Sequence, residues 1–247
     1  MSLSVVLPCF NEAPNIAATI RDVQSWLERV HLEGEIIAVD DGSSDETLAV
    51  LRGLQQEVRI LRVVRHEVNR GYGAAVRSGC DAAEKEVVAF MDSDGQFHAE
   101  DLGLLLAFIP EFAFVTGLRV KRADPFPRSL NSHLYKVLVR FVLGVRVTDV
   151  NCGMKMFRRS LWKTIRPEFA TGALINAEMF YAMTIEGIPW KELAVPHYPR
   201  TAGTQTGANL RVIFRMFREL WILRRSRRAL HERRKQAEVS GGEERIS

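Results

Sequence analysis

The chain of 247 residues contains little cysteine. Its three cysteines, Cys9, Cys80 and Cys152, are odd in number and widely spaced, with no CxxC pair and no histidine cluster beside them. This pattern indicates neither a disulfide framework nor a zinc site. The N-terminal MSLSVVLPCFNE also lacks the basic and then apolar stretches of a secretion signal. We therefore expect a reducing, intracellular setting.

Long apolar runs are missing as well. The nearest candidate, residues 102–118, is interrupted by Pro110 and Glu111. A transmembrane helix needs about 18 or more consecutive apolar residues, so we expect a chain that does not cross a membrane by itself. The hydrophobic content of 47% is nonetheless ordinary for a globular protein with a real core.

Positive charge is concentrated in one segment. Residues 211–235 contain ten Arg or Lys and two Glu, whereas residues 1–210 are slightly negative although the whole chain carries +4. The overall basicity therefore describes the C-terminal segment and not the main body. No nucleic-acid recognition motif accompanies the basic run, so we expect no nucleic-acid partner.

Short runs rich in Val and Ile alternate with helical patterns. This alternation predicts β-α-β units on a mostly parallel sheet. The expected strands are residues 4–8, 35–39, 60–65, 87–91 and 112–116. Helices are expected over residues 15–30, after an N-cap at Ser44, and over residues 130–143.

Polar residues follow the first two expected strands, which end in PCFNE and VDDGSSDET. The carboxyl edge of a parallel sheet is where open α/β proteins bind ligands. The residues at that edge are Asn11, Glu12, Asp40 and Asp41. A simple β-turn explains DDGS equally well, because Asp and Gly favour turn geometry.

The segment FMDSDGQFH, residues 90–98, follows the fourth expected strand. In extended chain Asp92 and Asp94 point to the same side and repel each other, which indicates a cation between them. Mg²⁺ and Mn²⁺ prefer oxygen ligands, and Mg²⁺ is commonly held by one or two carboxylates plus substrate phosphates. The alternative is a solvated turn that caps a helix starting near Glu100.

The segment NRGYGAAVRSG, residues 69–79, matches half of a dinucleotide-binding fingerprint. Gly71 and Gly73 fit, but Val76 occupies the third position, which disfavours a dinucleotide-dependent dehydrogenase. The alternative is a glycine turn that lets a helix begin close to a ligand or a neighbouring strand.

Seven segments occur in the order and rough spacing of family 2 glycosyltransferases with a GT-A fold. They are SVVLPCFNE, VDDGSSDET, NRGYGAAVRSG, FMDSDGQ, GLRVKR, TDVNCGMKMFRRS and PRTAGT. Within that family the chain resembles the polyprenyl-phosphate sugar synthases, such as dolichyl-phosphate mannose synthase. The resemblance covers about residues 3–205. It implies an α/β, Rossmann-like GT-A catalytic domain over residues 1–207. The residues that follow predict a basic amphipathic helix and polar tail over residues 208–247.

The resemblance also implies a reaction. A sugar would pass, with inversion, from a GDP- or UDP-sugar to a polyprenyl phosphate, either dolichyl or undecaprenyl phosphate, with Mg²⁺ or Mn²⁺ as cofactor. The alternative acceptor is a hydroxyl group of a saccharide or another non-lipid molecule. An alternative of another class is a catalytically silent, membrane-associated adaptor that keeps the fold.

The family's site residues carry over to matching positions of this chain. The donor nucleotide would be held by Pro8, Phe10, Glu12 and Asp41, with Asp40 beside them. The metal would be held by Asp92, Asp94 and Gln96. The phosphates, including that of the acceptor lipid, would be bound by Arg119, Arg128, Ser132 and Arg200. The guanidinium group suits phosphate oxygens, although arginines in a basic connection are also simply solvated.

Asp94 and Asp149 are the catalytic candidates. Asp149 falls at the family's acidic position near sugar and acceptor, where it would be a base toward a hydroxyl group or would position an ionised phosphate. We favour positioning, because a lipid phosphate needs little deprotonation at neutral pH. Glu178 either faces the acceptor or is an exposed helical carboxylate.

An apolar stripe near the C-terminus is bordered by arginines. Its members are Leu210, Ile213, Phe214, Phe217, Leu220 and Trp221. Such a helix can lie on an anionic membrane surface or pack on the catalytic domain. Residues 224–235 are expected to be too charged to pack. We expect the segment to hold a cytoplasmic enzyme on the cytoplasmic face of the membrane as a peripheral protein.

Overall fold

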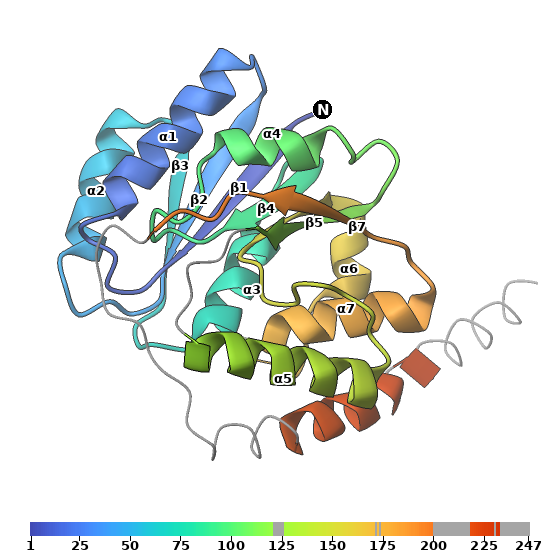
Figure 1. Ribbon diagram of the computed structural model, residues 1–247. Helices are drawn as coiled ribbons and strands as arrows, with labels where there is room; N and C mark the ends of the chain where they lie inside the picture. The colour runs from blue at the N-terminus through green and yellow to red at the C-terminus, as the bar shows by residue number, and fades with distance from the viewer. Residues whose placement is uncertain (121–125, 171, 173, 200–217, 230, 233–247) are drawn as a thin grey trace, which may run out of the picture.

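A mixed sheet forms the centre of the computed structural model. The structure describes residues 1–120, 126–170, 172, 174–199, 218–229 and 231–232, without the side chains of residues 126–133. The strand order is β3-β2-β1-β4-β6-β5-β7 (Figure 1). β6 is antiparallel to β4 and β5, and the other pairs are parallel. The strands are β1 (Leu3–Cys9), β2 (Gly34–Asp40), β3 (Leu61–Arg65), β4 (Val87–Met91), β5 (Phe114–Arg119), β6 (Met154–Arg158) and β7 (Lys191–Val195).

Helices cover both faces of the sheet. α1 (Ile16–Arg29), α2 (Thr47–Glu57) and α4 (Glu100–Leu106) pack on one face. The other face carries α3 (Tyr72–Ala82), α5 (Phe126–Leu143), α6 (Trp162–Ile165), α7 (Leu174–Glu186) and a helix over residues 218–229. The α/β, mostly parallel architecture predicted from the sequence is confirmed.

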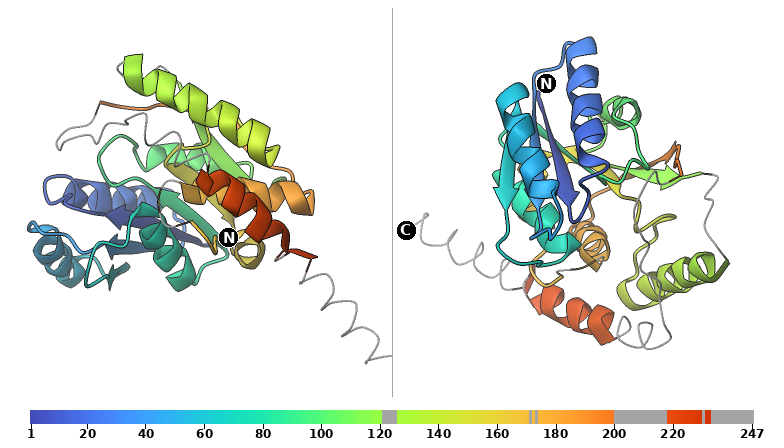
Figure 2. Two further views of the ribbon diagram at one scale, coloured as in Figure 1. Left: turned by 90° about the horizontal axis from the view of Figure 1, so that it is seen from below. Right: turned by 90° about the vertical axis from the view of Figure 1, so that its left-hand side faces the viewer.

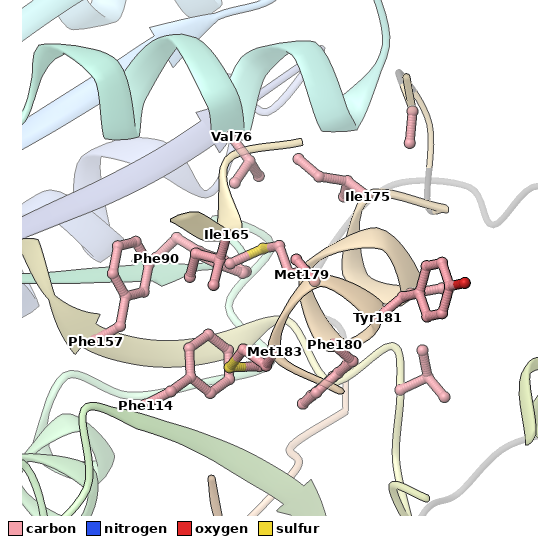
Figure 3. Close-up of a cluster of buried hydrophobic side chains, with 14 of the residues drawn as sticks. Val76, Phe90, Phe114, Phe157, Ile165, Ile175, Met179, Phe180, Tyr181 and Met183 are labelled. Atoms are coloured by element: carbon pink, nitrogen blue, oxygen red, sulfur yellow. The ribbon is translucent and has the colours of Figure 1, made fainter. Parts of the chain in front are cut away.

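The two cores follow from the alternation of side chains along each strand. On β1, Val5 and Leu7 pack under α1, whereas Val6 faces the opposite core. Gly79 allows α3 to approach β1 closely, because a Cβ at this position would lie 2.2 Å from Val6 Cγ1. Figure 3 shows the core under α3 and α7, where aromatic rings from β4, β5 and β6 meet Phe180 of α7.

Several local predictions were wrong. β6 and β7 were not predicted, and β5 extends to Arg119. α5 begins at Phe126, four residues before the predicted start. Ser44 does not cap α2: the helix begins at Thr47, whose N–H bonds to Asp45 Oδ1 at 3.0 Å. Ser44 instead donates its N–H to Asn11 Oδ1 at 2.8 Å, which joins the loops after β1 and β2.

The helix over residues 218–229 packs on the body of the protein, beside α5 and α7 (Figures 1 and 2). Leu220 and Leu223 are buried in the core under these helices, and Arg227 is buried as well. The prediction that residues 224–235 are too charged to pack was therefore wrong for Arg227. Trp221 and Ile222 remain about half exposed. Within the described residues, none of the helices combines the length and the apolar character that a bilayer crossing demands.

The loops that carry the candidate residues meet at one edge of the sheet. β1, β2 and β4 are parallel neighbours, so the segments that follow them leave the same edge. β5 ends at that edge too, because β4 and β5 are both antiparallel to β6 and therefore run in the same direction. β7 also ends there, because it pairs in parallel with β5. The loop before β6 enters from there, since Met154 pairs with Met91 at the end of β4.

Candidate active site

The loops after β1 and β2 interlock beside the proposed donor site. Asn11 adopts a left-handed conformation with φ of 55° and donates its N–H to Ser43 Oγ at 3.0 Å. The N–H of Glu12 bonds to Thr47 Oγ1 at 2.8 Å, and Glu12 Oε2 accepts a bond from Asn15. These contacts hold Glu12 at the rim of the edge.

Two further residues of the predicted donor site, Pro8 and Phe10, lie at the end of β1 beside this rim. Pro8 is buried in β1, and its carbonyl accepts a 2.7 Å hydrogen bond from Ser93 Oγ, which ties β1 to the turn after β4. Phe10 follows β1 with 45% of its surface exposed. An exposed ring beside buried carboxylates can stack on a planar base while the carboxylates accept hydrogen bonds from it.

Asp40 and Asp41 are both buried at the end of β2. Asp40 Oδ1 accepts the N–H of Ser43, and its Oδ2 atom is buried without a hydrogen-bond partner in the described part of the chain. Asp41 accepts bonds from His66 and from the backbone N–H groups of Arg70 and Gly71. The DDGS segment is thus a turn whose two carboxylates face inward and stabilise neighbouring loops.

Asp92, Asp94 and Gln96 lie together in the turn after β4. Asp94 Oδ1 accepts the N–H of Gln96 at 3.1 Å. Gln96 Nε2 donates to the carbonyl of Tyr198 at 3.2 Å, and Tyr198 N–H bonds back to the Gln96 carbonyl at 3.1 Å. The segment after β7 therefore lies directly against this turn.

The electrostatics of this turn fit a divalent cation. Burial and the neighbouring charge of Asp94 raise the pKa of Asp92 to about 6. Asp92 Oδ1 is buried with no hydrogen-bond partner in the residues described, an arrangement that costs free energy unless a cation or donor is present. Gly153 leaves room for this carboxylate, because a Cβ there would lie 1.9 Å from Asp92 Oδ2. In the described regions, no three His, Cys, Asp or Glu side chains gather as metal ligands, so phosphate oxygens and water would complete the coordination.

Arg119 and Asp149 form a buried, two-pronged ion pair. Arg119 Nε lies 2.7 Å from Asp149 Oδ2, and Arg119 Nη2 lies 2.8 Å from Oδ1. Although burial opposes its charge, the hydrogen-bonded carboxylate raises the pKa of Arg119 above its usual value. A carboxylate that accepts two guanidinium bonds is stabilised as the anion and is a poor proton acceptor. The geometry therefore suits positioning better than general-base chemistry.

Lys155, which was not predicted as a site residue, lies behind this pair. Its side chain is fully buried in β6, and Nζ donates to the carbonyls of Val150 and Cys152. Burial lowers the pKa of Lys155 to about 8, while the charges of Asp149 and Asp92 oppose that shift. Lys155 thus fixes the loop that carries Asp149. A single lysine within the apolar run MKMF is the signal that could have revealed it.

Three predicted phosphate-binding residues are not described. Arg200 lies outside the described residues. Arg128 and Ser132 belong to α5, but their side chains lie outside the description. Arg119 is thus the one member of the predicted phosphate-binding set whose contacts are known.

Glu178 has neither of the two roles expected for it. Its side chain is fully buried on α7 and accepts the backbone N–H groups of Glu168, Phe169 and Ala170. Burial raises the pKa of Glu178, although these N–H groups and nearby Arg227 favour its ionised form. Glu178 therefore holds the segment before α7 in place instead of facing a substrate.

Comparison with known proteins gives a consistent result. The family described as "Glycosyl transferase family 2" matches residues 4–166. Dodecaprenyl-phosphate galacturonate synthase of Rhizobium johnstonii is 29% identical over 238 residues, which cover 94% of this chain and 70% of the relative. Undecaprenyl-phosphate 4-deoxy-4-formamido-L-arabinose transferase of Pectobacterium carotovorum is 29% identical over 223 residues, or 87% of this chain and 65% of the relative. The chain thus spans about two thirds of the length of these curated relatives.

Solved structures with the same fold include glucosyl-3-phosphoglycerate synthase of Mycobacterium tuberculosis. Its complex with Mn²⁺, UDP and glucosyl-3-phosphoglycerate has a TM-score of 0.68 and 22% identity, and the match covers 92% of this chain and 79% of that one. Its complex with Mg²⁺ and UDP has a TM-score of 0.65 and 21% identity, with the same coverage of both chains. At this level of identity the likeness concerns the fold.

Proposed function

This chain belongs to glycosyltransferase family 2, and we propose that it transfers a sugar from a nucleoside diphosphate donor to a polyprenyl phosphate. The observation that carries the proposal is the meeting of two carboxylate sites at one sheet edge. Asp92 and Asp94 follow β4, whereas Asp40 ends β2 and Asp41 follows it, with β1 between the two strands. The acceptor class is supported by two relatives whose names specify polyprenyl phosphates.

The residues of the chain suggest a division of labour. Phe10, Glu12 and Asp41 would bind and orient the nucleoside, and Asp40 supports the turn that holds them. Asp92, Asp94 and Gln96 would hold Mg²⁺ or Mn²⁺, which, when bound, neutralises the charge on the departing diphosphate. Arg119, together with Arg128, Ser132 and Arg200, would bind phosphate groups of donor and acceptor.

Asp149 would position the acceptor through Arg119. The paired guanidinium holds the carboxylate in one orientation, and Lys155 fixes the loop beneath it. A phosphate acceptor is already ionised at neutral pH, so the attacking oxygen needs alignment more than deprotonation. The attack would come from the face opposite the leaving diphosphate, with inversion at the anomeric carbon.

Sugar transfer into lipid tests the proposal directly. The purified protein is incubated with radiolabelled UDP- and GDP-sugars and polyprenyl phosphate, with Mg²⁺ or Mn²⁺ and separately with EDTA. Metal-dependent label in the organic phase is the expected result. Donor consumption with label only in the aqueous phase would favour a hydroxyl acceptor. Nucleotide binding without any turnover would favour the catalytically silent adaptor.

Asp149→Asn distinguishes the two acceptor classes. With a phosphate acceptor, the variant is expected to keep activity reduced about 10- to 100-fold, because the amide still bonds to Arg119 but loses the charge pair. If Asp149 is instead an essential general base, the substitution is expected to lower the rate of sugar transfer by about 10²–10⁴-fold. The measurement is kcat between pH 6 and 9. A variant whose residual activity rises in proportion to hydroxide concentration would indicate the base and the hydroxyl acceptor.

We further propose that the helix over residues 218–229 and α5 bind the membrane surface. Trp221 and Ile222 are about half exposed beside Arg224, whose guanidinium lies 5.7 Å from the Trp221 ring centroid. α5 exposes Val137 and Phe141, the latter with 81% of its surface in solvent. Exposed apolar side chains next to arginines favour the surface of an anionic bilayer.

Flotation with liposomes tests this surface without unfolding the protein. Deleting the helix would uncover the core around Leu220 and Leu223, so exposed residues are changed instead. Trp221→Ser combined with Ile222→Ser is expected to weaken binding to phosphatidylglycerol-containing vesicles about tenfold or more. The matched control is Val30→Ser with Leu104→Ser, two exposed residues of the opposite helix layer. Equal flotation of both double variants would contradict the proposal.

A further inference from the structure

The turn between β3 and α3 contains a buried histidine to which the proposed site assigns no role. His66 Nδ1 lies 2.6 Å from Asp41 Oδ1, and His66 Nε2 lies 2.9 Å from Ser78 Oγ on α3. The side chains of His66 and Asp41 are only 4% and 3% exposed. Because a carboxylate only accepts hydrogen bonds, Nδ1 carries the proton in this contact.

The Asp41 carboxylate is held from several sides. In addition to the His66 bond, Oδ1 accepts the N–H of Arg70 at 2.9 Å, and Oδ2 accepts the N–H of Gly71 at 2.8 Å. A carboxylate has about four acceptor positions, so these three bonds fix its orientation and leave capacity for one further donor. An N–H group of a nucleobase has the right chemistry to be that donor.

The backbone around these residues is closely packed. The His66 N–H bonds to the Asp40 carbonyl at 2.9 Å. Gly42 has φ of +70°, and a Cβ on it would lie 2.5 Å from the carbonyl carbon of Val68. The loops after β2 and β3 therefore support each other, and His66 is the side chain that joins them through Asp41.

The same turn reaches the proposed metal site. α3 begins at Tyr72, directly after Gly71, whose φ of 91° requires glycine. Tyr72 lies near Asp92, where its hydroxyl opposes the rise in the pKa of that carboxyl group. Residues 66–71 thus bond to the carboxylate proposed for the nucleoside and lead directly to Tyr72, which lies near a carboxylate proposed for the metal.

We propose that His66 is a positioning residue for the donor nucleotide, acting by fixing the carboxylate of Asp41. This inference rests on the proposed function, in which Asp41 bonds to the nucleoside. Without His66 the carboxylate would keep only its two backbone donors and could rotate away from the base. Donor affinity should fall while the chemical step, once the donor is bound, should change little.

The test compares three variants with the wild-type chain by calorimetric titration with UDP and GDP in Mn²⁺, without acceptor. His66→Leu removes the Nδ1 donor, and His66→Asn retains an N–H near the same position. His231→Leu is the matched control, because it removes a 2.7 Å contact between His231 and Glu186 of α7, neither of which belongs to the proposed site. Thermal melting of each variant shows whether the protein remains folded at the titration temperature.

We expect His66→Leu to weaken nucleotide binding about tenfold, and His66→Asn to restore most of that loss. The KM for donor should follow the dissociation constant, whereas kcat should stay within about threefold of wild type. Equal binding by wild type and His66→Leu would overturn the inference and leave the proposed function intact. Equal weakening in both His66 variants would also overturn it, by assigning His66 a packing role. A wild-type protein that binds neither nucleotide would overturn the proposed function itself.

Discussion

Replacing Asp94 with asparagine is expected to lower kcat/KM for sugar transfer by about 1,000-fold, and Asp92→Asn by a similar factor. Charge stabilisation by a bound cation is worth several kcal/mol, and about 4 kcal/mol corresponds to this factor. Each substitution removes one anionic ligand from a pair that the structure keeps close together and largely buried. The steady-state rate of donor-dependent label transfer is the measurement.

A matched carboxylate provides the control for this prediction. Asp101 is also buried near the start of α4, and it accepts the N–H of His98 outside the proposed site. Asp101→Asn is expected to keep activity within about threefold of wild type once its stability is taken into account. Binding of Mn²⁺, followed by its electron paramagnetic resonance signal, should be lost in the Asp92 and Asp94 variants alone. Full activity of the wild-type enzyme in EDTA would refute a catalytic metal.

Replacing Glu178 with alanine is expected to reduce the free energy of unfolding by about 3–5 kcal/mol. The change leaves three backbone N–H groups of residues 168–170 without their acceptor and removes the carboxylate 3.6 Å from Arg227. Unsatisfied buried donors and an uncompensated buried charge are among the most costly defects in a folded protein. Urea unfolding followed by circular dichroism measures the loss.

Arg227 supplies the other half of this prediction. Its guanidinium donates to the carbonyls of Thr164 and Arg166, so the helix over residues 218–229 is bonded to the C-terminal end of α6. Glu178→Gln and Arg227→Met, combined in a double-mutant cycle, are expected to show a coupling energy of about 1–3 kcal/mol. Arg228→Ala, at the next and exposed position, should change stability by less than about 0.5 kcal/mol. Additive effects of the two buried substitutions would show that the pair does not stabilise the fold.

The part of the fold that the sequence predicted follows from simple periodicity. β1, β2 and β4 are apolar runs buried on both faces, and they alternate with helices that have one apolar stripe. β7 was missed because KELAV is only partly buried at the sheet edge and carries two charged residues. β6 was missed because Lys155 and the neighbouring arginines interrupt the apolar sequence pattern that indicates a buried strand.

The part of the candidate site that could be predicted from the sequence consists of carboxylates located where strands end. Asp40, Asp41, Asp92 and Asp94 each come directly after a recognisable strand, so topology alone brings them to one edge. The pairing of Arg119 with Asp149 could not be inferred from spacing, because the two residues are 30 positions apart and meet only through the antiparallel β6. Glu178 was misread because its burial depends on backbone donors and on an arginine from a distant helix.

The position of Leu220 and Leu223 in the core has a consequence for how the protein is made. A chain emerging from the ribosome folds from its N-terminal side first, and α3, α5 and α7 are complete before the helix over residues 218–229 has been synthesised. Until then the core cluster to which Leu220 and Leu223 belong lacks these two side chains. Before residues 218–229 emerge, the nascent polypeptide therefore exposes apolar surface to which chaperones can bind. A chain whose synthesis stops before residue 218 would lack this part of the core, and we expect it to be degraded without becoming active.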